Sequence, residues 1–495
     1  MLTHVFRPVQ VKRDFDTSGV TTSGNSEKRG HARSVGTLGG VLALLLSLLL
    51  GGMPPARAAP TQKLFQTCLM RDGGAHLVAG DVANIAKYDL AILNGFHYYD
   101  LGGNAWAQIR KLNPNILIYL YEMGSESASH QDAWPRVSLN NLGRYNVSRG
   151  HPMGSLNGNH PELFLLDASG NRIHNPGQGY TGYLLMDFGS PVYQAYWVEA
   201  VREDIVAQPW VADGVFVDGC GASKDPTPYT PPKYPNNATW GPAMNSFSQA
   251  IQKGMSKYGQ RIFANRGGTS ESSDGIAQWK LLDASATPPD AVFEEGAFAV
   301  GWGSKPIGSG YQVQFFSESA WKRQVDVMSL IHHSKVGYES QCSRLTETQS
   351  GVDNYGKPVG FWDIFWFSMC SYLLGKNIVE NNSYWGFVES GNLTVRYGEY
   401  DSIDLGNATG TYKVTNVGGT NVYWREYRNG YVYVNPTGND VASVALPKAC
   451  KKLSHANFTL PLTGIPDVTS ISLPAHRGVI VMIDSAASAT APAAP

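Results

Sequence analysis

The segment Gly-Val-Phe-Val-Asp-Gly at residues 214–219 decides the fold class. It is a run of apolar, strand-forming residues that stops at a carboxylate followed by glycine. The segment Ala-Val-Phe-Glu-Glu-Gly at 291–296 repeats the pattern. A continuous apolar run bounded by turn residues is typical of a strand in a parallel sheet that is covered on both faces. An acid at its C-terminal end lies where a (β/α)₈ barrel carries its active-site residues.

Strand-like and helix-like segments alternate on both sides of these two runs, which is the pattern of a parallel sheet wrapped by helices. We expect a closed (β/α)₈ TIM barrel over about 86–388, inside a domain at 60–388. The expected strands are 88–94, 116–121, 184–187, 215–218, 261–265, 291–295, 336–339 and 377–380. The expected helices are 105–112, 190–207, 244–258, 275–282, 320–333 and 361–374.

Helical spacing disappears after about Gly391, and short alternating strands replace it. We expect strands at 411–414, 422–427, 431–435, 443–446, 470–473 and 479–483, with a hairpin turn at Asn429-Gly430. These segments predict a small all-β antiparallel C-terminal domain at 389–485. The Ser/Ala/Pro-rich end, 486–495, is expected to be disordered.

The N-terminal 59 residues differ from the rest of the chain. A basic stretch at 28–33 precedes an apolar stretch at 35–50 and the small-x-small pattern Ala56-Arg57-Ala58. The apolar stretch is shorter than the ~20 residues of a membrane span. We therefore expect a leader and signal peptide at 1–59, cleaved near Ala58, and a secreted, periplasmic or extracellular protein. An uncleaved N-terminal anchor is the alternative.

The composition limits the classes of partner. The 495 residues include 39 basic and 40 acidic ones, so the net charge of −1 gives no electrostatic reason to expect nucleic acid or, after signal cleavage, a membrane as partner. The five cysteines match no zinc-binding spacing. We expect no metal, no organic cofactor and a monomer. The 12 Trp and 25 Tyr suit either a large core or a groove that binds sugars.

Asp218 is the first catalytic candidate, because ionising a carboxylate at the end of an apolar strand is costly unless the charge has a use. A loop cap or an ion pair with Arg is the alternative. Glu294 and Glu295 compete for a second role, since alternate residues of a strand face opposite sides. Phe216 shares a face with Asp218, and Phe293 shares one with Glu295, so we favour Glu295.

Polar or aromatic residues also end other strands or follow them. We expect substrate contacts from Glu122, Asp187, Asn265, Arg266, Trp302 and Glu339, with Asn94 and Glu380 as further strand-end candidates. Each could instead cap a loop. Tyr229, Trp240 and Trp385 are candidates for stacking on sugar rings or for core packing.

Several segments resemble known barrel glycosidases. The hairpin-like stretch 161–172, the passage 186–191, the strand 213–218 and the segment 428–436 resemble a hypothetical glycoside-hydrolase-like barrel family. That family lies near the α-galactosidase and endo-α-1,4-polygalactosaminidase-like barrels. The resemblance implies a catalytic pair formed by Asp218 and either Glu295 or Glu294, and a C-terminal β-domain after the barrel.

Together these observations predict a secreted glycoside hydrolase that cleaves O-glycosidic bonds of a poly- or oligosaccharide with two carboxylates. Asp218 is expected to be the nucleophile or base, and Glu295 the general acid. A non-catalytic carbohydrate-binding protein on a degenerate barrel is the main alternative. A polysaccharide lyase would need a Tyr or Lys base, whereas these strand ends are acidic.

Overall fold

The computed structural model describes residues 64–71, 76–128, 161–173, 183–207, 212–224, 231–269, 272–307, 310–342, 345–376, 383–389 and 395–484. All of them belong to one compact unit, Gln62–Pro495. The expected signal peptide, the expected strand at 377–380, the C-terminal tail, Tyr229 and Glu380 lie outside the described residues. None of the helices in the described part has the length and apolar character that a membrane span requires.

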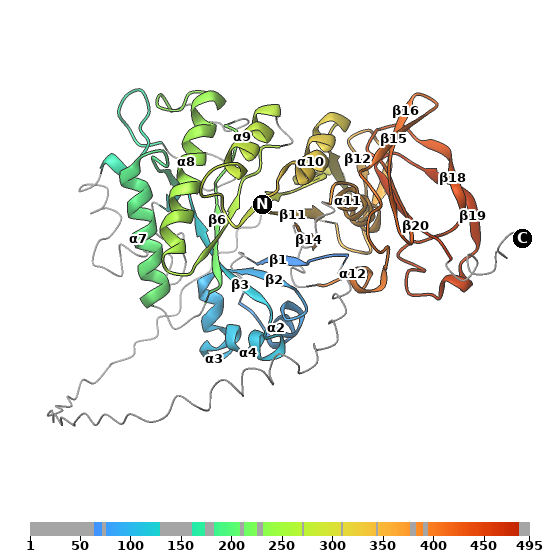
Figure 1. The fold of residues 1–495 in the computed structure, drawn as a ribbon, viewed down its shortest axis with the longest axis horizontal. Coiled ribbons are helices and arrows are strands. Elements are labelled where there is room, and N and C mark those ends of the chain that lie inside the picture. Colours follow the sequence, from blue (N-terminus) through green and yellow to red (C-terminus); the bar gives the residue numbers. More distant parts are fainter. Residues whose placement is uncertain are drawn as a thin grey trace, which may run out of the picture. The chain divides into compact units, whose positions relative to one another are not determined.

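A sheet of eight parallel strands forms the barrel (Figure 1). In sheet order the strands are β1 (Cys68–Arg71), β2 (Leu90–Leu93), β3 (Leu117–Met123), β6 (Gly214–Asp218), β7 (Arg261–Asn265), β8 (Ala291–Glu295), β11 (Lys335–Cys342) and β14 (Ser383–Glu389). A parallel bridge between Thr67 and Trp385 brings the two edge strands together. The expected barrel is therefore confirmed.

Helices follow the strands, as the sequence predicts. They are α2 (Ala79–Ile85), α3 (Asp100–Gly103), α4 (Ala105–Leu112), α7 (Pro191–Ala207), α8 (Asn237–Ser256), α9 (Ser273–Asp283), α10 (Glu318–Leu330), α11 (Phe361–Gly375) and α12 (Glu399–Ser402), with a 3₁₀ helix, η1 (Gly95–Tyr99), after β2. Helix α8 begins seven residues earlier than expected. The side chain of Asn236 caps it by accepting from the Thr239 amide, and the helix accommodates Pro242.

The predicted set of barrel strands needs correction. The segment expected as the third barrel strand, 184–187, contributes instead to β5 (Tyr183–Leu185), which pairs antiparallel with β4 (Glu126–Ala128) outside the barrel. Two barrel strands were not expected from the sequence: β1, and β14, which follows the expected eighth strand at 377–380. Because one strand is gained before β2 and one is lost after β3, Asp218 still ends the fourth strand of the barrel.

A second small sheet is built from the segments that follow β8 and β11. Its order is β13 (Pro358–Gly360), β12 (Ser350–Asp353), β10 (Gly310–Phe315) and β9 (Ala299–Ile307). Since β9 begins four residues after Glu295, this sheet fixes the segment that leaves the barrel there.

The C-terminal sheet has six antiparallel strands, as expected. They are β15 (Lys413–Val417), β16 (Thr420–Tyr427), β17 (Gly430–Asn435), β18 (Val441–Lys452), β19 (Asp467–Leu473) and β20 (Arg477–Met482). The hairpin joins β16 to β17, with Tyr427 paired to Gly430. One face of this sheet packs on α11, where a Cβ at Gly478 would lie 2.6 Å from that of Cys370.

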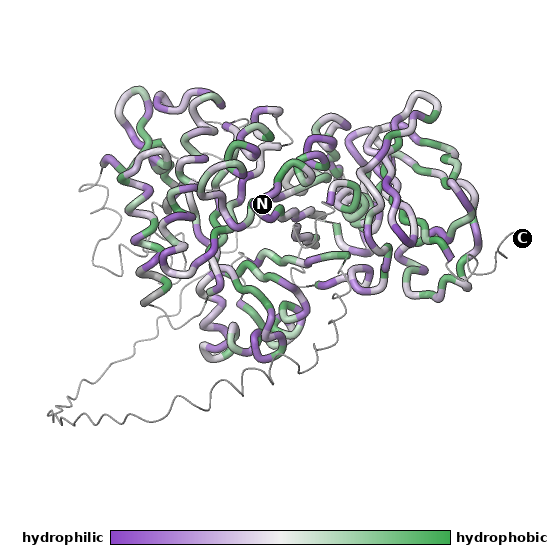
Figure 2. Tube along the Cα trace, viewed as in Figure 1, coloured by the Kyte–Doolittle hydropathy of each residue, from purple (hydrophilic) through white to green (hydrophobic). Residues whose placement is uncertain are grey.

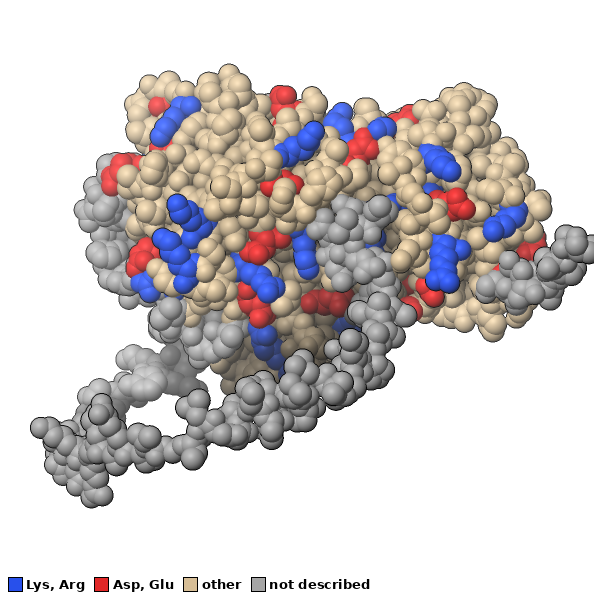
Figure 3. All heavy atoms as spheres, in the orientation of Figure 1, with Lys and Arg blue, Asp and Glu red and all other residues tan. Residues whose placement is uncertain are grey.

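The distribution of side chains agrees with this layered arrangement. Figure 2 shows hydrophobic residues along the barrel strands β1, β2 and β3 and along α11. The charged side chains drawn in Figure 3 are interspersed by sign over the described part of the visible face. Cys68, Cys220, Cys370 and Cys450 are buried thiols without a disulfide.

Candidate active site

Asp218 and Glu295 end two strands, β6 and β8, that are separated in the barrel by β7 alone. Both side chains are partly exposed, although the other residues of the two strands are buried. Each is followed by a glycine with φ of 70°, Gly219 and Gly296. Other residues rarely adopt this conformation, so each glycine lets the chain turn out of the barrel directly after the carboxylate.

Asn265, at the end of β7, joins the two carboxylates. Its Nδ2 donates to Oδ1 of Asp218 and to Oε2 of Glu295, each at 2.8 Å. Asp218 also accepts from its neighbour Gly219 N, at 2.7 Å, and from the hydroxyl of Tyr121 on β3. Asp218 thus accepts three hydrogen bonds, and its orientation is fixed by side chains of β3 and β7 and by the amide that follows it.

The strand alternation separates Glu295 from Glu294. Glu294 is 2% exposed and faces the helix layer, where its carboxylate accepts from Thr269 Oγ1 at 2.7 Å and from Gln324 Nε2 at 3.3 Å. The Gln324 side chain accepts in turn, through Oε1, from the backbone amide of Phe298 at 2.8 Å. Glu294 therefore fixes the end of β8 to the helix layer, whereas Glu295 is the residue that lies beside Asp218.

An apolar layer lies beneath the pair inside the barrel. Phe216, Phe263 and Phe293 precede Asp218, Asn265 and Glu295 by two residues each. Their rings meet edge to face, with centroids 5.2 to 5.6 Å apart. Gly337 on β11 provides the space for them, because a Cβ there would lie 2.4 Å from Phe263 Cζ. The polar layer thus rests on a packed floor of aromatic rings.

Glu339 and Asp187 differ in their relation to the pair. Glu339 on β11 pairs in register with Glu295, lies on the same strand face as the inward-facing Gly337 and is 1% exposed. Its place is thus inside the barrel next to Glu295. Asp187 is bonded elsewhere, since it accepts from Tyr234 Oη at 2.7 Å and from Lys233 Nζ. These contacts tie Asp187 to the segment that precedes α8.

Two further candidates face away from the barrel interior. Arg266 is fully buried against α8 and donates to Asn245 Oδ1 at 2.5 Å and to Ser248 Oγ at 3.3 Å. Burial lowers the pKa of its guanidinium to about 10. Glu122 shares a face with Leu120, which belongs to the layer between strands and helices. The structure does not bring either residue to Asp218 and Glu295.

The aromatic candidates are mostly core residues. Trp240 is 3% exposed and packs edge to face on Phe188, and Trp385 is fully buried. Trp302 lies in β9, and its side chain is outside the described part of the structure. Tyr121 was not singled out from the sequence, although the alternation that pairs Phe216 with Asp218 would have placed it inside the barrel.

Within the described ranges, no three His, Cys, Asp or Glu side chains are arranged to hold a metal ion. Asp218 and Glu295 offer two adjacent carboxylates with one shared amide donor.

The chain shows low similarity to several solved structures. The isomaltulose synthase SmuA of Protaminobacter rubrum is 10% identical with a TM-score of 0.45, covering 86% of this chain and 99% of its own. The trehalose-6-phosphate hydrolase of Bacillus licheniformis is 11% identical with a TM-score of 0.42, covering 84% of this chain and 99% of its own. The α-galactosidase AgaA of Geobacillus stearothermophilus is 11% identical with a TM-score of 0.39, covering 81% of this chain and 52% of its own.

A comparison with curated proteins finds no match. The model of one protein family does match, over residues 110–431, which include both carboxylates and extend to β17 in the C-terminal sheet. This span is more than half of the chain. The protein belongs to the hypothetical glycosyl hydrolase family 15 (GHL15).

Proposed function

We propose that the protein hydrolyses O-glycosidic bonds of a poly- or oligosaccharide, with Asp218 and Glu295 as the catalytic pair. The observation that carries the proposal is the hydrogen bonding of both carboxylates to one amide, Asn265 Nδ2. Glycosidases place two carboxyl groups on either side of the scissile bond. Membership of a glycosyl hydrolase family supports the same reaction class.

The hydrogen bonding suggests a role for each carboxylate. Asp218, held by three donors, is positioned to attack the anomeric carbon while the bond from that carbon to the glycosidic oxygen breaks. Glu295 gives its proton to the departing oxygen. The ionised Glu295 then takes a proton from water, and the water oxygen displaces Asp218 from the anomeric carbon.

The experiment measures sugar release from a panel of 4-nitrophenyl α- and β-glycosides and soluble polysaccharides. We compare the wild type with Asp218→Asn, Glu295→Gln and Glu294→Gln. We expect Asp218→Asn to lower kcat/KM by about 10³-fold or more, and Glu295→Gln to cost about 10²–10⁴-fold. Glu294→Gln is the matched control. It is the same chemical change one residue away, on the opposite face, and should leave kcat/KM within a few-fold of the wild type.

The outcomes separate the alternatives. Wild-type rates in Asp218→Asn, with the fold intact by circular dichroism, would remove Asp218 from the reaction. An equal loss in Glu294→Gln and Glu295→Gln would mean that the assay reports damage to the strand end. Tight glycan binding by both wild type and Asp218→Asn, with no release from any probe, would favour a carbohydrate-binding protein on a degenerate barrel.

We also propose that the chain is exported and cleaved near Ala58, because a basic stretch, a short apolar stretch and a small-x-small pattern follow one another at the N-terminus. N-terminal sequencing of the exported protein is the test. A start close to Ala59 would support cleavage. A chain that keeps residues 1–58 and sediments with membranes would indicate an anchor instead.

A further inference from the structure

The side-chain oxygen of Asn94 is buried without a hydrogen-bond partner. It is 5% exposed, and its Oδ1 is inaccessible to solvent and accepts no hydrogen bond. Asn94 stands at the start of η1, but its side chain does not cap that helix. A buried amide oxygen without a partner is unusual, because native structures satisfy nearly all buried polar groups. A ligand with a hydrogen-bond donor would satisfy this oxygen when it binds.

The strand alternation directs Asn94 into the barrel. Leu90 and Ile92 on β2 belong to the cluster inside the barrel, whereas Ala91 and Leu93 belong to the layer under the helices. Asn94 keeps an extended backbone, with φ of −70° and ψ of 144°, so the alternation continues to it. Asn94 therefore points to the same side as Ile92, at the end of the barrel where Asp218 lies.

The register places Asn94 beside the catalytic pair. Leu93 pairs with Leu120, so the position opposite Asn94 on the neighbouring strand is that of Tyr121. Neighbouring strands are ~4.8 Å apart. Tyr121 donates to Asp218 from the same inner face. Tyr121 thus lies between the unpartnered Oδ1 of Asn94 and Asp218. In the proposed function Asp218 is the carboxylate that attacks the anomeric carbon.

The loop that begins at Asn94 is held in place. Asp100 is 7% exposed and accepts from the Leu77 amide at 2.7 Å, and its Oδ1 lies 2.5 Å from His76 Nδ1. Leu101 has a φ of 53°, a left-handed conformation that a branched residue rarely adopts. Strained residues of this kind gather near functional sites. The strand and the anchored loop fix the backbone on both sides of Asn94.

We propose that Asn94 binds the substrate, with Oδ1 accepting a hydrogen bond from a hydroxyl of the sugar whose bond the pair Asp218 and Glu295 cleaves. This assignment rests on the proposed function and adds a residue that determines specificity. A buried acceptor discriminates strongly, because a sugar without the matching hydroxyl leaves the amide unsatisfied again.

The first test measures the melting temperature without any substrate. Asn94→Leu removes an unsatisfied polar group at similar volume, so we expect a Tm equal to the wild type or raised by about 1 °C or more. Asn435→Leu is the matched control. Asn435 is fully buried and donates to three carbonyl oxygens, those of Asn439, Leu473 and Pro474, so its replacement should lower Tm. A Tm for Asn94→Leu that falls as far as that of Asn435→Leu would overturn the proposal.

The second test uses the 4-nitrophenyl glycoside that the wild type cleaves best, together with its monodeoxy analogues. We expect Asn94→Leu to lower kcat/KM by about 10–100-fold. One monodeoxy analogue should lose about as much with the wild type and nothing further with Asn94→Leu. If every analogue loses equally with both proteins, Asn94 does not bind a hydroxyl. If the wild type cleaves no probe at all, the proposed function fails. The Tm comparison uses no substrate, so it tests Asn94 independently of that result.

Discussion

Asp218 and Glu295 accept hydrogen bonds from the same Nδ2 atom of Asn265, so the separation of the two carboxylates is set by one planar amide. The three residues end consecutive strands of the barrel, β6, β7 and β8. Neighbouring strands cannot shift without breaking the sheet. The geometry of the pair is therefore a property of the barrel backbone, and the loops above it need not supply it.

This relationship predicts retention of anomeric configuration. The bridged oxygens lie no more than twice 2.8 Å from each other. Retaining enzymes hold their carboxyl groups ~5–5.5 Å apart, whereas inverting enzymes need ~6.5–9.5 Å to admit a water molecule. Proton NMR of the first sugar released from a cleaved aryl glycoside should show the configuration of the substrate. An inverted first product, seen before mutarotation, would mean that water attacks directly.

Removing the bridging amide should impair the reaction and spare the fold. Asn265→Ala takes one donor from each carboxylate, and the loss of one positioned donor typically costs about 10²-fold in kcat. The control is Asn113→Ala. Asn113 donates to the carbonyl oxygens of Ala86 and Tyr88 at the start of β2, the opposite end of the barrel. Turnover and urea unfolding are measured for both Asn265→Ala and Asn113→Ala. We expect Asn113→Ala to lose stability and to keep the wild-type turnover rate. Comparable rates in both variants would show that the bridge is dispensable.

Much of this site follows from the sequence. Alternation along buried strands places Phe216 with Asp218 and Phe293 with Glu295, and it separates Glu294 from them without any coordinates. Asn94 was a candidate because it ends a predicted strand, and the alternation rule applied to β3 would have added Tyr121. What alternation cannot supply is the pairing register. That register decides which strand ends meet, and it depends on packing between segments far apart in the chain.

The errors in the fold have a similar origin. Strand β1 has only four residues and comes before any helical segment, so its sequence carries little periodic signal. The segment at 184–187 is apolar and ends in Asp187, like a barrel strand, yet it pairs with β4. A short apolar run indicates burial, but it does not say which sheet covers it.

The floor of aromatic rings should be sensitive to a single methyl group. In Gly337→Ala the new Cβ would lie 2.4 Å from Phe263 and 2.7 Å from Phe293, and both rings are confined by their neighbours. Overpacking of this kind costs about 1–3 kcal/mol of the free energy of unfolding. Because these rings support Asn265 and Glu295, kcat/KM should fall as well.

Gly80→Ala is the control for that substitution. Gly80 lies in α2, and a methyl group added there would have no heavy atom within 4 Å outside its own helix turn. Alanine at this position should be neutral or stabilising by up to about 1 kcal/mol. Urea unfolding measures both variants, and equal stability of the two would show that the barrel interior has room to spare.

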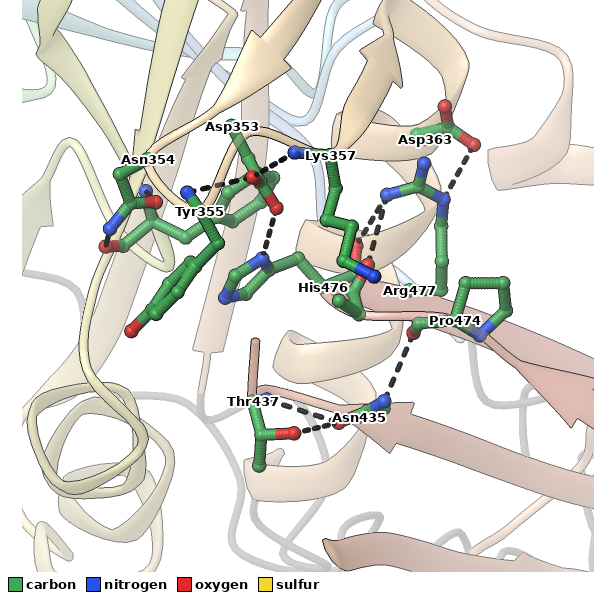
Figure 4. A network of polar contacts seen from close by, with 12 residues as sticks. Asp353, Asn354, Tyr355, Lys357, Asp363, Asn435, Thr437, Pro474, His476 and Arg477 are labelled. Atoms are coloured by element: carbon green, nitrogen blue, oxygen red, sulfur yellow. Dashed lines mark hydrogen bonds and ion pairs between the residues drawn. The ribbon is translucent and has the colours of Figure 1, made fainter. Parts of the chain in front are cut away.

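A buried network joins the small sheet to the C-terminal sheet (Figure 4). His476 Nδ1 lies 2.8 Å from Asp353 Oδ2, both side chains are fully buried, and the His476 ring stacks on Phe315 with centroids 4.3 Å apart. The other oxygen of Asp353 accepts from the amides of Tyr355 and Lys357, at 2.8 Å each. Burial lowers the pKa of His476 below its ordinary value of 6.5, although Asp353 acts in the opposite direction.

This network predicts a pH-dependent stability. The unfolded chain takes up a proton on His476 at a higher pH than the folded chain does. Its contribution to stability is therefore complete above pH ~6.5 and is lost as the pH falls toward the lower folded pKa, with a slope of at most about 1.4 kcal/mol per pH unit. His476→Asn does not titrate, and asparagine tolerates the φ of 50° at this position. Urea unfolding from pH 7.5 to 5.5 should show the wild type losing its advantage over the variant as the pH falls. A difference in unfolding free energy between wild type and variant that stays constant from pH 7.5 to 5.5 would mean that His476 protonates equally in the folded and unfolded chains.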